Sequence, residues 1–218
     1  MSQSCLMCGG TGKILPDGKP CPICSKEKLD NPPVVFGVPA QYQGIKFDKS
    51  FLPEKMQKYY GQYMEDLMEE IVTNISTFQK NILICSRPNS GKTVWSYNLY
   101  SQLTGMGINM PLLRDLAEVR NILNAYDADV QEAQLFSTAR CAIVRVPRDI
   151  QAWMFDCMSF IVERRVRSSG FTIFLYGGEE SDLKNQDRFG KLKYLKGSGA
   201  YNTIQIKSFS DTYNPEGR

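Results

Sequence analysis

A short segment with a Gly-Lys-Thr sequence constrains the fold of this chain more than any other feature. It fits the phosphate-loop pattern G-x-x-x-x-G-K-[ST] at every fixed position but the first. Its residues are Ser86, Arg87, Pro88, Asn89, Ser90, Gly91, Lys92 and Thr93. An apolar run at 81–85 precedes it, and a helical pattern at 91–103 follows it. Because loop N–H groups and a helix N-terminus together surround phosphate groups, the segment predicts an α/β fold with a nucleotide-binding loop.

The residue types of this segment also predict what each position does. Lys92 would contact the β- and γ-phosphates of ATP, and the Thr93 hydroxyl would bind Mg²⁺. The cofactor-binding residues are therefore Ser86, Pro88, Asn89, Ser90, Gly91, Lys92 and Thr93. Ser86 stands where the pattern has glycine, and it fits without strain only if its φ is negative. The alternative, a chance Gly-Lys-Thr at the start of a helix, is disfavoured by the strand and helix around it.

Hydrolysis of ATP needs a further acid, at the end of a neighbouring strand, to hold Mg²⁺ and activate water. The candidate strand is 141–146, and Pro147, Arg148 and Asp149 follow it. Asp149 is the only acid there, and it lies two or three residues later than expected. Its competing role is to cap the following helix, which its position favours. Nucleotide binding is thus better supported than hydrolysis.

Apolar runs and helical patterns alternate along most of the chain. Strands are predicted at 81–85, 108–113, 141–146, 171–176 and 203–206, and helices at 53–77, 91–103, 114–125, 149–167 and 187–195, with 127–138 a polar helix or loop. Repeated strand-then-helix spacing predicts a parallel sheet that helices cover on both faces.

The cysteines fall into two groups, in a chain that has seven cysteines and no histidine. Two CxxC pairs lie near the N-terminus, and they are formed by Cys5, Cys8, Cys21 and Cys24. Four thiolates with this spacing are typical of a closed, structural Zn²⁺ site. Two disulfides in an oxidising compartment are the alternative. The remaining cysteines, Cys85, Cys141 and Cys157, are predicted to be small buried apolar residues.

The overall composition excludes several classes of protein. A hydrophobic content of 42% with 22% charged residues is ordinary for a folded domain. No apolar run approaches the roughly 20 residues that cross a bilayer, and residues 1–10 do not resemble a secretory signal. We therefore expect a cytoplasmic protein without a membrane partner. The net charge of +3 does not by itself indicate a nucleic-acid binder.

The order of these motifs resembles the bacterial replicative-helicase loaders of the DnaC/DnaI type and the related IstB transposition ATPases, which are AAA+ proteins. A cysteine-rich segment precedes the ATPase core, as in the DnaI branch. Residues 38–42, Val-Pro-Ala-Gln-Tyr, and 45–48, Ile-Lys-Phe-Asp, look like the "IP.RY....F..F" motif of that family. The stretch 153–174 looks like the family's region between Walker B and sensor 1.

The resemblance carries over unevenly to the catalytic positions. The phosphate-loop residues match. The Walker B acids would fall near Pro147 and Arg148, so neither is present. The sensor 1 asparagine would fall near Tyr176. Arg188 matches one arginine-finger position, but Lys191 stands at the other. The chain thus resembles a loader that has lost hydrolytic groups, or a divergent phage version of one, and the catalytic candidates are Lys92, Asp149 and Arg188.

These observations predict four regions: a zinc-binding segment at 1–30, a linker and helix at 31–80, an AAA+-like core at 81–210 and a flexible tail at 211–218. The resemblance implies an ATP- and Mg²⁺-binding replication protein that loads or regulates a replicative helicase on single-stranded DNA, assembled as a homo-oligomer. A non-hydrolysing adaptor and an IstB-like transposition ATPase are the alternatives. In this interpretation the basic residues at 140–167 and 184–196 would face DNA. The alternative is that they form a solvent-exposed surface with no partner.

Overall fold

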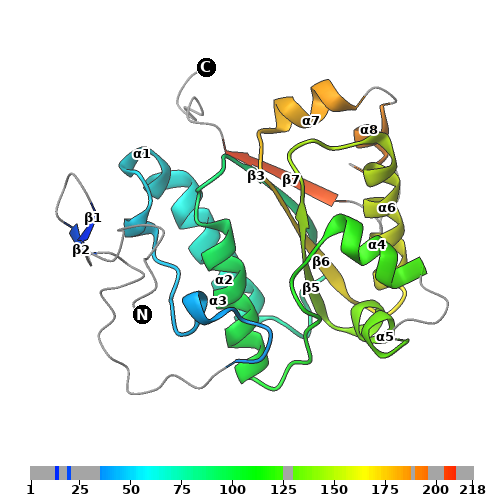
Figure 1. The fold of residues 1–218 in the computed structure, drawn as a ribbon, viewed down its shortest axis with the longest axis horizontal. Coiled ribbons are helices and arrows are strands. Elements are labelled where there is room, and N and C mark those ends of the chain that lie inside the picture. Colours follow the sequence, from blue (N-terminus) through cyan, green and yellow to red (C-terminus); the bar gives the residue numbers. More distant parts are fainter. Residues whose placement is uncertain are drawn as a thin grey trace, which may run out of the picture.

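A central parallel sheet organises the structure, as the alternating pattern predicts. The computed structural model describes residues 13–14, 19–20, 35–124, 130–187, 190–195 and 204–209. The strands of the sheet are β3 (Asn81–Ser86), β4 (Arg114–Asp115), β5 (Cys141–Val146), β6 (Phe171–Tyr176) and β7 (Ile204–Phe209). Their order is β4-β5-β6-β3-β7, and all four strand pairs are parallel (Figure 1). The strand that leads into the phosphate loop is therefore flanked by β6 and β7.

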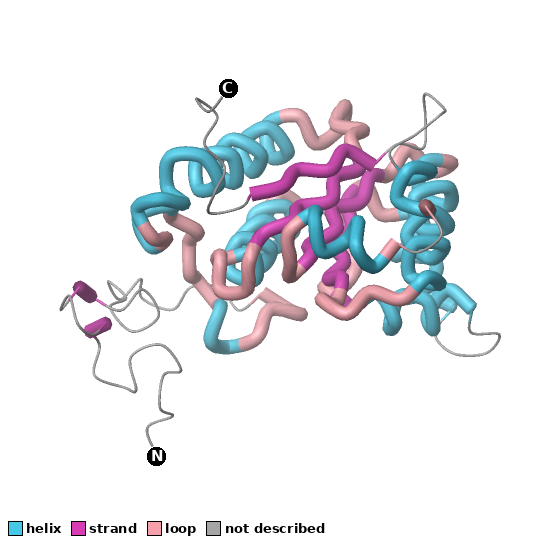
Figure 2. The backbone as a smooth tube through the Cα atoms, turned by 90° about the horizontal axis from the view of Figure 1, so that it is seen from above, coloured by secondary structure: helices cyan, strands magenta, loops and turns pink. Residues whose placement is uncertain are grey.

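Helices cover both faces of this sheet (Figures 1 and 2). One face packs against α2 (Gln62–Thr73) and α3 (Lys92–Gly105). The other packs against the remaining helices, which are α4 (Leu116–Asn124), α5 (Val130–Thr138), α6 (Ala152–Val166), α7 (Glu180–Gln186) and α8 (Lys191–Leu195). The predicted three-layer α/β arrangement is confirmed.

The buried strands send alternate side chains to two separate cores. In β3, Ile82 and Ile84 join the core beneath α2 and α3, whereas Leu83 and Cys85 join the core beneath α6. Because both faces are covered, the strands read as continuous apolar runs rather than as alternating ones. The prediction for the three later cysteines is confirmed, since Cys85, Cys141 and Cys157 are buried thiols.

The segment before the sheet is built from short turns and one interrupted helix. The turns are η1 (Ala40–Tyr42) and η2 (Lys49–Phe51), and the helix comprises α1 (Glu54–Met56), the π-helical turn η3 (Gln57–Gly61) and α2. The predicted helix at 53–77 is confirmed apart from its last turn. The π turn was not predicted, and it carries Tyr60, which is 2% exposed. Single π turns often occur at functional sites.

Several predicted elements differ from the observed ones. The predicted strand at 108–113 is not a strand, although its apolar residues Met110 and Leu113 are buried in the core as predicted strand residues would be. Pairing with β5 is confined to Arg114 and Asp115 in β4. The helix α7 was not predicted as an element of its own. Phe160, predicted on the apolar face of α6, is 44% exposed.

A two-stranded antiparallel hairpin lies between the two CxxC pairs in sequence. Its strands are β1 (Lys13–Ile14) and β2 (Lys19–Pro20). The predicted zinc ligands Cys5, Cys8, Cys21 and Cys24 lie outside the described residues. Among the residues that the structure does describe, no group of three or more metal-ligating side chains comes together. The zinc site and the four predicted region boundaries stay predictions.

Candidate nucleotide-binding site

The phosphate loop lies at the carboxyl end of β3, where it leads into the N-terminus of α3. The ends of β6 and β7 flank β3 in the sheet. Ligands of open α/β sheets bind at the carboxyl ends of the strands. The fold thus places the predicted residues where a phosphate group would be bound.

Two residues with positive φ shape the backbone of the loop. Asn89 has a φ of 63° and Gly91 a φ of 77°. Asparagine and glycine tolerate this left-handed conformation, which other residues adopt rarely. Residues 87–89 are exposed. Left-handed residues beside right-handed ones turn successive N–H groups into a concavity that binds anions, so the backbone suits a phosphate.

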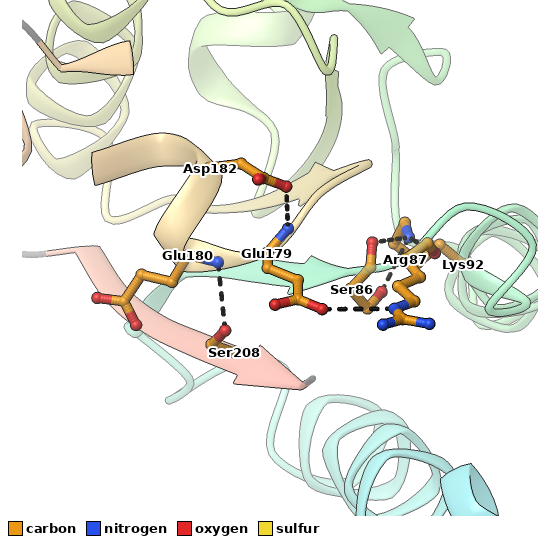
Figure 3. Close-up of polar contacts among 7 residues, drawn as sticks. All are labelled: Ser86, Arg87, Lys92, Glu179, Glu180, Asp182 and Ser208. Atoms are coloured by element: carbon orange, nitrogen blue, oxygen red, sulfur yellow. Dashed lines mark hydrogen bonds and ion pairs between the residues drawn. The ribbon is translucent and has the colours of Figure 1, made fainter. Parts of the chain in front are cut away.

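Lys92 is held inside the loop by protein oxygens (Figure 3). Its Nζ donates to the Ser86 carbonyl, the Ser86 hydroxyl and the Arg87 carbonyl at 2.8 Å each, and to the Ser90 hydroxyl at 2.9 Å. Burial lowers the pKa of this ammonium group to about 8, because a charged lysine loses its water there. The oxygens of the loop therefore take the place of the water that a charged lysine would otherwise bind.

Two buried serines link the loop to the helical segment before it. The Ser86 and Ser90 hydroxyls lie 2.8 Å apart, and Ser90 donates to the phenol oxygen of Tyr60 at 3.3 Å. Burial raises the pKa of Tyr60 to about 12, so the phenol stays neutral. Among the described non-glycine residues only Asn89 and Ser169 have positive φ. Ser86 therefore causes no backbone strain, and the sequence-based concern about a strained loop is not supported.

An acid that the sequence did not suggest lies at the phosphate loop. Glu179 follows β6, and its Oε1 is 3.4 Å from Nε of Arg87 (Figure 3). The Asp182 carboxylate accepts the Glu179 N–H at 3.0 Å and so fixes the turn that presents Glu179. The sequence does place acids within four residues of the end of β6. Because β6 lies beside β3 in the sheet, their position could have indicated an acid near the phosphate loop.

Asp149 occupies neither of the two positions predicted for it, beside the phosphate loop or at the N-cap of the next helix. Strand β5, which precedes it, is separated from β3 by β6. Asp149 is exposed, and within the described part of the chain it makes no hydrogen bond or ion pair with the phosphate loop. It does not cap the next helix either, because α6 begins at Ala152 with Gln151 at the N-cap position. The capping interpretation was therefore wrong.

The remaining predicted residues are distributed as follows. Thr93 lies in the first turn of α3, and its carbonyl accepts from the Ser96 hydroxyl at 2.9 Å. Arg188 lies outside the described residues. Lys191, which stands at the family's second arginine-finger position, forms an ion pair with Asp156 of α6. In this structure Lys191 therefore has a contact within its own chain.

Several of the basic residues between 140 and 167 have structural partners. Arg140 donates to the carbonyls of Ile75, Ser76 and Phe78, after the end of α2. Arg165 is fully buried and donates to the carbonyls of Phe136, Ala139 and Phe171. These two arginines hold elements together, so fewer cations remain for DNA than the sequence suggested.

Sequence comparisons give no match for this chain. No protein-family model matches it. A search of curated proteins finds no match either. In the described residues, no helix is both long and apolar enough to span a membrane.

Three solved replication proteins share the fold. The structure of DnaI matches with a TM-score of 0.52 at 11% identity, over 81% of this chain and 94% of DnaI. The DnaC helicase loader matches with a TM-score of 0.51 at 12% identity, over 77% and 99%. The replication initiator DnaA, bound to AMPPCP and single-stranded DNA, matches with a TM-score of 0.52 at 8% identity, over 75% of this chain but only 50% of DnaA. The chain therefore has the fold of the DnaC/DnaI-type helicase loaders, as its motifs predict.

Proposed function

We propose that this chain is an ATP-binding accessory protein of DNA replication, which loads or regulates a replicative helicase on single-stranded DNA. The observation that carries the proposal is the phosphate loop, which joins β3 to α3 with Lys92 inside it. The fold supports it, since the DnaC helicase loader and the AMPPCP-bound DnaA are similar structures. Ser86 to Thr93 would hold the nucleotide, and Mg²⁺ would bind at the Thr93 hydroxyl.

The test is whether the chain and ATP together place a replicative helicase on DNA. The full chain is mixed with the helicase and circular single-stranded DNA, with and without Mg-ATP, and retained helicase is measured. We expect retention to rise only when both the chain and ATP are present. Equal retention in all mixtures would contradict the proposal.

A second function, a non-hydrolysing adaptor, is favoured by the missing Walker B acids. The Walker B positions hold Pro147 and Arg148, and Asp149 does not contact the loop in the described structure. ATP turnover distinguishes the two functions. Helicase retention without turnover above the helicase's own rate would identify the adaptor, and turnover that depends on this chain would identify an ATPase.

The N-terminal segment would be the contact with the helicase. Zn²⁺ held by Cys5, Cys8, Cys21 and Cys24 would fold it, because a segment this short buries too little apolar area to fold alone. The antiparallel pairing of Lys13 with Pro20 fits this assignment, since it reverses the chain between the two CxxC pairs. Deletion of residues 1–30 should abolish retention of the helicase and leave nucleotide binding intact.

A further inference from the structure

We propose that the Ser86 hydroxyl is a positioning group that holds Lys92 back from the phosphate site and so weakens nucleotide binding. The inference rests on the proposed ATP-binding function and identifies how the affinity of that site is set. Ser86 occupies the one fixed position at which the loop departs from its pattern.

The lysine is saturated by the oxygens that surround it. An ammonium group has three donors, and Lys92 has four acceptors at 2.8–2.9 Å. Ser86 supplies two of them, the carbonyl and the hydroxyl. A glycine would supply only the carbonyl. The hydroxyl is thus the acceptor that exists because of the substitution.

The hydroxyl is itself fixed, so the lysine has a defined retracted position. Ser86 is 0% exposed, and its Oγ lies 2.8 Å from Oγ of Ser90. Ser90 in turn donates to the buried Tyr60 phenol at 3.3 Å. Because the two serine hydroxyls are buried and bonded to each other, they need no rearrangement to accept hydrogen bonds from Lys92. A phosphate must compete with both hydroxyls for the lysine.

The other cation of the loop, Arg87, contacts a protein carboxylate. Arg87 lies beside Glu179, which follows the neighbouring strand β6. Both loop cations therefore have partners within the protein before any nucleotide is bound, neutral oxygens for Lys92 and a carboxylate for Arg87. Binding exchanges these contacts for contacts with phosphate, and its free energy is the difference between the two sets.

The experiment compares Mg-ATP affinity, by calorimetry, for the wild type, Ser86→Ala, Ser86→Gly and the matched control Ser137→Ala. The Ser137 hydroxyl donates to the Ala133 carbonyl inside α5 at 2.7 Å, away from the loop. We expect both Ser86 variants to bind ATP about three- to tenfold more tightly, because one competing acceptor of a charged donor is gone. Ser137→Ala should equal the wild type.

A second readout separates positioning from a merely structural role. Without nucleotide, the Ser86 variants should melt at a lower temperature than the wild type, since they lose buried hydrogen bonds. Stability and affinity would then change in opposite directions, whereas a damaged loop would lower both. If the wild type binds ATP and both Ser86 variants bind it with equal or lower affinity, the inference about Ser86 is overturned and the proposed function is not. No nucleotide binding by any variant would overturn the proposed function as well.

Discussion

At the scale of single residues, the environment of Lys92 decides how the site behaves. The side chain is surrounded by neutral oxygens from Ser86, Arg87 and Ser90, and no carboxylate is among its hydrogen-bond partners in the described structure. Desolvation is then the dominant influence on its charge, which is why its pKa is lowered to about 8. A bound polyphosphate would supply the negative charge that this position lacks.

The pKa of Lys92 predicts how ATP affinity depends on pH. Phosphate favours the charged lysine, so binding raises its pKa above the value of about 8 in the free protein. Affinity should be nearly constant well below pH 8, should be reduced about twofold at pH 8, and should then fall by up to about tenfold per pH unit as the free lysine loses its proton. Calorimetric titration from pH 7 to pH 9.5 measures this. Lys92→Arg, which stays charged, is the control, and an equal decline in both proteins would rule Lys92 out as the cause.

At the scale of elements, buried polar contacts fix how the helices meet the sheet. Arg165 of α6 binds the carbonyls of Phe136 and Ala139, before β5, and of Phe171 in β6. Gly170 must lack a side chain there, since a Cβ would lie 2.8 Å from the Ala139 carbonyl oxygen. One cation thus joins α5, α6 and β6 at the amino end of the sheet.

Replacing Arg165 should therefore destabilise the whole domain. Arg165→Met removes the donor for three carbonyls and should lower the free energy of unfolding by about 3 kcal/mol. The neighbouring Arg164, which is exposed, offers a matched control, and Arg164→Met should change stability by less than about 0.5 kcal/mol. Urea denaturation measures both. Similar losses of unfolding free energy in the two variants would show that the buried hydrogen bonds of Arg165 contribute no more to stability than an exposed arginine does.

The turn from β3 into α3 depends on glycine at position 91. Gly91→Ala places a side chain at a φ of 77°, with its Cβ 3.1 Å from Phe47. We expect a loss of about 1–2 kcal/mol in stability and weaker ATP binding. Gly105→Ala, at the other end of α3, meets nothing within 4 Å and should leave ATP affinity unchanged. Thermal unfolding and calorimetry test the pair, and wild-type behaviour of Gly91→Ala would contradict the loop geometry.

At the scale of the whole molecule, local patterns predicted most of the fold but not the contacts that topology creates. The strands at β3, β5 and β6 were recognised because apolar runs such as 82–85 are buried on both faces. Glu179 was missed because its contact with Arg87 depends on β6 lying beside β3, which sequence order does not reveal. Arg165 was counted as a surface cation because nothing local indicates burial.

The predicted zinc-binding segment would be a second folding unit of the molecule. The purified chain should contain about one zinc ion, and Cys5→Ser or Cys21→Ser should release it. Cys157→Ala, which alters a buried thiol of the core, should retain the metal. Metal analysis after gel filtration measures the stoichiometry. A zinc-free wild type with a folded N-terminal segment would exclude the site.

The affinity of Lys92→Ala for Mg-ATP tests the central claim most directly. Lys184→Ala is the control, because that lysine is exposed and pairs with Glu180 on α7. If the loop binds phosphate, Lys92→Ala should weaken ATP binding by at least about tenfold, since charge-assisted hydrogen bonds to phosphate are lost, whereas Lys184→Ala should match the wild type. Equal affinities in all three proteins would contradict the assignment of this loop as a nucleotide site.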